Sequence, residues 1–118
     1  MTLETRNLDT PDERRSFEHG ALNVVNIAGA TVGRAVFNPG WKWSNDVKPI
    51  AGTDSCQVAH FGYVLSGSMR IYMDDGSETE IKAGDVVAIP PGHDAEVSGP
   101  EACVMVDFGE IGDYAKRS

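Results

Sequence analysis

The stretch Gly84-Asp85-Val86-Val87-Ala88-Ile89-Pro90-Pro91-Gly92 says most about the fold of this chain. Its apolar run, rich in valine and isoleucine, predicts a short buried strand over residues 86–89. Turn-forming residues lie on both sides, because glycine and proline interrupt regular structure. A short strand between two sharp bends is typical of sheet proteins with many short connections.

The rest of the chain repeats this alternation of short strands and turns. Strand-like runs are predicted at residues 22–27, 31–37, 56–65, 69–73, 79–81, 95–97 and 103–108. The segment Asp74-Asp75-Gly76-Ser77 predicts a hairpin, since Asp and Gly tolerate the left-handed backbone of tight turns. Residues 44–53 are expected to form a loop. The pattern predicts an all-β domain, built as a sandwich or a closed barrel.

The 118 residues of the chain suit one domain with one hydrophobic core. Residues 1–20 are polar and predict an arm or a short helix outside the core. Residues 21–110 are expected to form the β-barrel domain, and residues 111–118 a polar C-terminal tail. One domain of this size predicts one pocket.

The charge balance argues against several classes of partner. With 18 acidic and 10 basic residues the formal net charge is −8, so nucleic acid and anionic membranes would be repelled. The first residues lack the apolar core of a signal peptide, and no apolar run approaches membrane-spanning length. A cytoplasmic location is therefore expected, with Cys56 and Cys103 as reduced thiols. Cys103, in a late apolar strand, is assigned to the core.

Two stretches resemble sequence motifs of the cupin superfamily, whose members are small β-barrels of the jelly-roll type. Gly84, Pro90 and Gly92 match the family's second motif, and Ala95 stands where that motif has its histidine. In the first motif, counting back from Gly67 puts His60 at the glutamate position. The resemblance covers about residues 30–108 and implies a single-domain cupin barrel with a short polar N-terminal arm.

Two registers are open for the two histidine positions of the first motif. Counting forward from Gly40 places Asp46 and Lys48 there, with an insertion before His60. Counting back from His60 places Asp54 and Cys56 there instead. Neither register restores the family's usual ligand set.

The resemblance favours a metal site inside the barrel, with His60 at a motif position and His93 two residues before the motif's histidine position, where its ring could reach the same spot. Cys56 and His60 would share one face of a regular strand, and Asp46 could add an oxygen ligand. Such a nitrogen and sulfur set suits a divalent metal ion, zinc first, with iron, copper, manganese or nickel as alternatives. In the opposing interpretation the histidines are hydrogen-bonded polar residues and Cys56 is a buried thiol.

A small-molecule ligand is the expected partner of this interior. Trp41 and Trp43 are two residues apart and should face one side, either as an aromatic wall of a pocket or as core. Lys48 and Arg34 could bind a carboxylate, although a solvated cation is the simpler interpretation of each. His19 is assigned to the surface or an interface.

Three functions are compatible with these residues. The first is a small metal-binding cupin that binds or transforms a small organic molecule inside the barrel. The second is a non-catalytic ligand-binding or sensor barrel without metal. The third is a structural protein with a degenerate pocket, in which the polar arm joins two copies into a homodimer, as the family resemblance implies.

Overall fold

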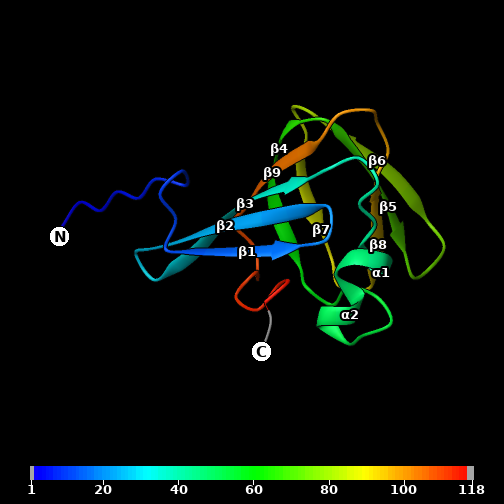
Figure 1. Cartoon of the computed structure of the whole chain (residues 1–118), viewed down its shortest axis with the longest axis horizontal. Coiled ribbons are helices and arrows are strands. Elements are labelled where there is room, and N and C mark those ends of the chain that lie inside the picture. Colours follow the sequence, from blue (N-terminus) through cyan, green and yellow to red (C-terminus); the bar gives the residue numbers. More distant parts are fainter. Residues whose placement is uncertain (1, 117–118) are drawn as a thin grey trace.

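The computed structural model describes residues 2–116, most of which lie in antiparallel strands (Figure 1). The strands are β1 (Glu13–Phe17), β2 (Gly20–Ile27), β3 (Ala30–Phe37), β4 (His60–Ser66), β5 (Ser68–Met73), β6 (Glu78–Lys82), β7 (Val86–Ile89), β8 (His93–Val97) and β9 (Cys103–Asp107). They form a larger sheet in the order β1-β2-β3-β9-β4-β7 and a smaller sheet in the order β6-β5-β8. The two sheets enclose one core.

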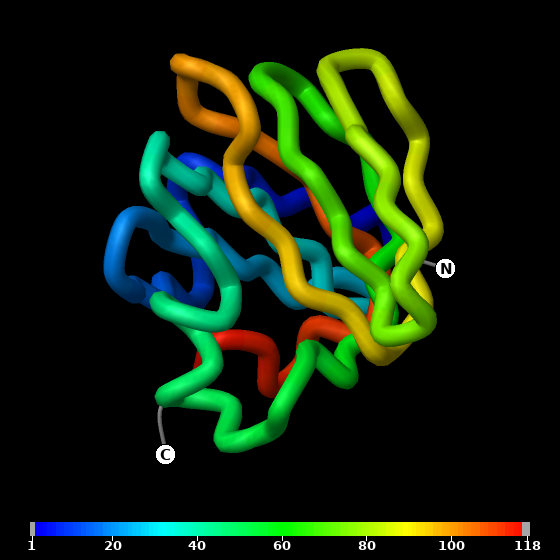
Figure 2. The backbone as a smooth tube through the Cα atoms, turned by 90° about the vertical axis from the view of Figure 1, so that its right-hand side faces the viewer, coloured from blue at the N-terminus to red at the C-terminus, as the bar shows by residue number. Residues whose placement is uncertain are grey.

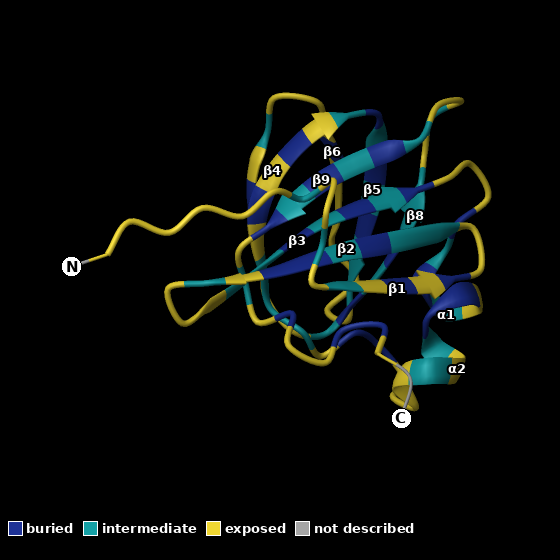
Figure 3. Cartoon of the chain, turned by 60° about the vertical axis from the view of Figure 1, so that its left-hand side comes forward, coloured by how far each residue is buried: buried dark blue, intermediate teal, exposed yellow. Residues whose placement is uncertain are grey.

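Burial alternates along the strands, as Figure 3 shows by its alternating dark and light bands. Leu22 and Val24 of β2, Met69 and Ile71 of β5, and Met105 of β9 all point into the space between the sheets. Since successive side chains of a strand point to opposite faces, this spacing buries one face of each sheet. The predicted all-β jelly-roll class is confirmed. The barrel is not closed by hydrogen bonds, because β6 and β7 are edge strands of different sheets.

Most predicted strands and turns are present with small shifts at their ends. The hairpin between β5 and β6 falls at residues 74–77, as the Asp-Asp-Gly-Ser run predicts. The expected strand from residue 56 is an exception, since β4 begins only at His60. Cys56 instead forms an isolated bridge with His93, which leaves residues 57–59 outside the ladder.

The expected loop at residues 44–53 contains two short helices, α1 (Trp43–Asp46) and α2 (Lys48–Ala51). The Asp46 carboxylate accepts a hydrogen bond of 2.9 Å from the Lys42 backbone N–H and so closes the first turn. Gly52 ends α2 with a left-handed backbone, φ 75°, which glycine adopts without strain. No helix among the described residues has the length and apolar character needed to cross a bilayer.

The expected polar arm contains β1, which pairs with β2 along its full length. Arg15 and Phe17 are buried, and the Arg15 guanidinium donates to the carbonyls of Ile111, Gly112 and Tyr114 at 2.7 to 2.8 Å. The prediction that this segment lies outside the core is therefore wrong for residues 13–17. Residues 2–6 are exposed and extend away from the sheets (Figure 1), whereas Leu8 and Asp9 bond to outward side chains of β2 and β3.

Residues 111–116 of the expected polar tail also pack against the core, and residues 117–118 lie outside the described residues. Ile111, Tyr114 and Ala115 are buried. Figure 2 shows this segment, in red, crossing one end of the space between the two sheets. Arg15 holds the segment in place by satisfying backbone carbonyls that would otherwise be buried without partners.

Candidate metal site

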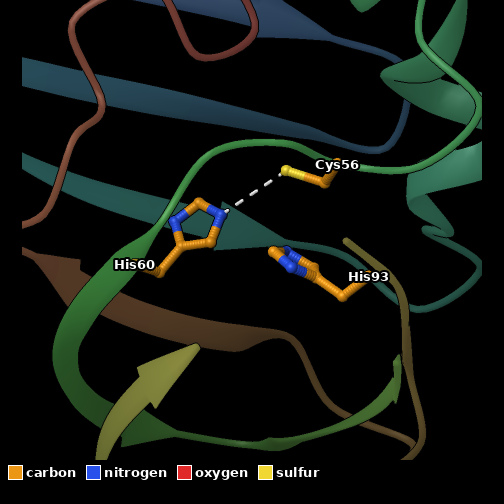
Figure 4. A group of neighbouring side chains, drawn as sticks. All are labelled: Cys56, His60 and His93. Carbon is orange, nitrogen blue, oxygen red and sulfur yellow. Dashed lines mark hydrogen bonds between the residues drawn. The ribbon is translucent and has the colours of Figure 1, made fainter. Parts of the chain in front are cut away.

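Three side chains with metal-binding atoms meet at the end of the barrel that the C-terminal segment crosses. Cys56 precedes β4, His60 opens β4, and His93 opens β8 in the opposite sheet (Figure 4). Their ligand atoms all lie within 4.8 Å of one another. The Cys56 N–H donates to the His93 carbonyl at 2.7 Å, so the backbone itself joins the two segments here. The structure thus brings together three of the four predicted ligands.

Both imidazole rings are oriented by a hydrogen bond at Nδ1. His60 Nδ1 lies 2.5 Å from Oδ2 of Asp107, and His93 Nδ1 lies 2.8 Å from the Pro90 carbonyl oxygen. A carbonyl can only accept, so the Nδ1 of His93 carries the proton and its Nε2 keeps a lone pair in the neutral ring. Such fixed outer partners are typical of metal-binding histidines.

Asp107 is a functional residue that the sequence analysis missed. Its side chain is buried, and its Oδ1 accepts the Gly109 N–H at 2.8 Å while Oδ2 binds His60. Alternation along β9 places Cys103, Met105 and Asp107 on the same inward face. An acidic residue at an inward position of an otherwise apolar strand is unusual, and it could have identified Asp107 from the sequence.

Cys56 and His60 form a strongly coupled pair. Burial acts to lower the pKa of His60, but hydrogen bonds with Asp107 and Cys56 outweigh it and raise this pKa to about 9. Burial acts to raise the pKa of Cys56, but hydrogen bonds with His60 and His93 lower it to about 6. Near neutral pH the pair is therefore a thiolate and an imidazolium, and a metal ion would displace the proton of His60.

One pair of donor atoms has the spacing that a tetrahedral zinc ion requires. Zinc bound to sulfur and nitrogen at its usual distances places those two atoms about 3.6 Å apart. Cys56 Sγ lies 3.7 Å from His60 Nε2, drawn as the dashed line in Figure 4. Three protein ligands also leave a fourth coordination position for water or a substrate, as in catalytic zinc sites.

A cavity of about 30 Å³ adjoins the two histidines, with room for one or two water-sized groups. Trp41 and Trp43 both line it, and both are buried. Their indole N–H groups have no hydrogen-bond partner in the described chain. The remaining walls are mainly apolar: Ala35, Phe37, Met69, Ile71, Ala95 and Met105.

Tyr114 lines both this cavity and a larger pocket nearby. Its ring meets His60 edge-on, with centroids 5.1 Å apart. Together with Trp43 and Cys56, Tyr114 also lines a pocket of about 290 Å³. Burial raises the pKa of Tyr114 well above 10, so its phenol stays neutral. Tyr114 lies in the segment expected to be a polar tail, so its place at the site was not predicted.

Asp46 does not join the three clustered side chains. Its carboxylate caps the turn at Lys42 and lies 3.3 Å from Nδ1 of His19, which is largely exposed as predicted. Lys48 is half-buried in α2 and does not line the cavity. Arg34 forms an ion pair with Asp9 at 2.7 Å on the outside of the sheet. The first motif register, Asp46 and Lys48, places neither residue in the cluster. Of the second register, Cys56 reaches the site and Asp54 is exposed.

Comparisons with known proteins agree with this architecture. Residues 54–109 match the family model described as cupin domain. A cupin-superfamily sugar phosphate isomerase from Silicibacter pomeroyi is 18% identical, with 91% of this chain and 75% of that chain covered and a TM-score of 0.64. A protein of unknown function from Rhizobium leguminosarum is 19% identical, with 92% and 97% covered and a TM-score of 0.63.

A third similar structure is the formate complex of oxalate decarboxylase from Lactobacillus farciminis, 15% identical with a TM-score of 0.60. The match covers 83% of this chain but only 30% of that enzyme. No curated protein matches the chain. At these identities the structural matches establish the fold.

Proposed function

We propose that the chain is a cupin-superfamily protein that binds a divalent metal ion, zinc first, and binds or transforms a small organic molecule beside that ion. The ligands in this proposal are Cys56, His60 and His93. One observation carries it: three ligand atoms from separate segments lie within 4.8 Å, two of them on imidazoles already oriented at Nδ1. Thiolate with imidazole favours zinc or copper over manganese, while iron and nickel remain alternatives.

A bound zinc ion would supply Lewis acidity and lower the pKa of a bound water molecule. The residues of the chain have other tasks. Asp107 keeps the His60 ring in place through Nδ1, and the apolar cavity wall excludes bulk water. Tyr114 and Trp43 limit what reaches the histidines from the larger pocket. The small cavity favours a substrate that places only a few atoms beside the metal.

Two of the similar structures support the idea of a small, oxygen-rich molecule. One is described as a sugar phosphate isomerase, and the other as an oxalate decarboxylase in complex with formate. Both names refer to small organic molecules that carry oxygen donors, which bind well to an open position on a zinc ion.

The direct test is elemental analysis of the untagged protein with zinc titration by calorimetry. The wild-type chain is expected to bind one ion, and His93→Asn to bind it more than about 100-fold more weakly, since loss of an outer-shell partner alone costs 10- to 100-fold. His19→Asn is the matched control, because His19 is exposed and Asn tolerates its positive φ of 63°. Absence of metal in the wild type, or equal affinity in His93→Asn, contradicts the proposal.

The alternative is a ligand-binding barrel that works without metal. The unpartnered indole N–H groups of Trp41 and Trp43 favour it, because buried donors are costly until an acceptor reaches them. Titration of the metal-free protein with formate, followed by tryptophan fluorescence, separates the two functions. Binding that is unchanged in His93→Asn supports the alternative, whereas binding that requires zinc supports the first proposal.

A further inference from the structure

Three neighbouring strands of the larger sheet carry an uncharged apolar surface on their outer side. We call it the apolar face, and its residues are Phe61, Tyr63, Leu65, Val86, Val106 and, directly after β9, Phe108. Tyr63 of β4 is paired directly with Val86 of β7 on one side and with Val106 of β9 on the other. Cross-strand partners point to the same side of a sheet, so the surface is continuous.

The apolar face is unusually exposed for large apolar side chains. Its members other than Val106 are 41% to 71% exposed, and among the described residues only Leu3 adds another exposed large hydrophobic side chain. Since a buried aromatic side chain covers 150–250 Å², these fractions correspond to roughly 500 Å² of apolar surface. This area is near the upper end of the range for the largest apolar patch on a monomeric protein, and patches of that size are commonly interaction sites.

The other half of the same sheet shows what a solvated outer face looks like here. On β1, β2 and β3 the outward positions include Arg14, Asn23 and Arg34. These side chains pair with one another or with the N-terminal segment, where Asn23 donates to the Leu8 carbonyl at 3.0 Å. The apolar face has no such cover. Its edge strand β7 also lacks the charged residues that usually protect an edge.

We propose that the apolar face is the interface of a homodimer, with the same face of a second copy packed against it. A chain with a net charge of −8 repels its own copies, so close approach requires a region without charges, and all six residues of the apolar face are uncharged. The same net charge disfavours an anionic membrane as the occupant. Two-fold symmetry brings this face against itself, apolar against apolar.

The available area is adequate for such a dimer. A stable interface buries about 800 Å² on each partner, of which a little over half is apolar. The roughly 500 Å² of the apolar face supplies that apolar part, and the surrounding polar residues would form the rim. Sheets that stack face to face usually lie about 10 Å apart with their strands nearly aligned. The apolar face could pack against a second copy in this way. This inference does not depend on the metal site.

Sedimentation analysis of the full chain tests the proposal. The wild-type protein is expected to have twice the 12.7 kDa mass of one chain. Phe61→Glu and Val86→Glu are expected to weaken the dimer by at least about 30-fold, because each puts an unpaired charge at the centre of an apolar interface. Ser16→Glu is the matched control, since it adds the same charge at an exposed position on the polar half of the sheet. Circular dichroism checks that each variant is folded.

Three results would overturn the proposal. The first is a wild-type protein that stays monomeric at the highest concentration measured. The second is a dimer that persists unchanged in both glutamate variants. The third is a dimer that dissociates when residues 1–6 are deleted but survives Phe61→Glu, which would place the interface on the N-terminal segment.

Discussion

The two faces of β4 differ in almost every physical respect. On the inner face, His60 is held by Asp107 and Cys56, and Val64 is fully buried. On the outer face, Phe61 and Leu65 are exposed and have no polar atoms to satisfy. A metal site needs donors fixed in position, whereas an association surface needs mainly apolar area. Strand alternation supplies both within seven residues and keeps them separable by mutation.

Gly62→Ala should give the largest effect, because it disturbs both faces together. A Cβ at Gly62 would lie 2.1 Å from the Val106 carbonyl oxygen and 3.2 Å from the Asp107 Cα. Relieving that clash would separate β4 from β9, at a cost of about 3 kcal/mol in the free energy of unfolding. Chemical denaturation measures this loss, and both metal binding and dimer formation should weaken with it.

Gly112→Ala provides the comparison for that variant. A Cβ at Gly112 would meet nothing within 4 Å, and its carbonyl remains free to accept from Arg15. Its stability is expected to stay within about 1 kcal/mol of the wild type. If Gly62→Ala were as stable as Gly112→Ala, the close contact between β4 and β9 would be refuted.

Asp107→Asn should affect the inner face alone. The amide keeps the shape of the side chain but removes the charge that orients His60 and strengthens its hydrogen bond at Nδ1. Loss of such an outer partner lowers metal affinity by 10- to 100-fold. Zinc titration measures that change, and sedimentation should show an unchanged dimer. An unchanged zinc affinity would show that Asp107 has no part in the site.

Titration of the metal-free protein gives the smallest effect but resolves the inner face best. The pKa of Cys56 is lowered to about 6, so its thiolate should persist from neutral pH downward and disappear as the pH falls through 6. Burial raises the pKa of Cys103 to about 11, so that thiol stays protonated over this range. Ultraviolet absorbance of the thiolate follows the transition.

Asp107→Asn should move the midpoint of that titration upward. The imidazolium of His60 stabilises the thiolate, and Asp107 in turn stabilises the imidazolium. Cys56→Ser should abolish the transition altogether. A wild-type midpoint near the ordinary cysteine pKa of about 8.5 would show that the ion pair does not form.

Local sequence determined the strands and most of the turns. The alternation in β5 and β9 and the Asp-Asp-Gly-Ser hairpin follow from side-chain period and turn chemistry, which depend only on near neighbours. The inward placement of Cys56 and His60 was predicted as well. That prediction assumed that both residues belong to one regular strand. In the structure β4 begins at His60, and the bridge between Cys56 and His93 positions the thiol.

Tertiary structure decided which polar groups belong to the interior. Asp46 was predicted as a ligand but caps a turn. Asp107 and Tyr114 at the site were missed, as was Arg15, which holds the backbone of the segment that carries Tyr114. Their partners lie 47 to 99 residues away in the chain. The order of polar, apolar and turn-forming residues within a segment is enough to predict strands and turns. Whether a buried charge is tolerated depends on a partner that only the folded chain brings within hydrogen-bond distance.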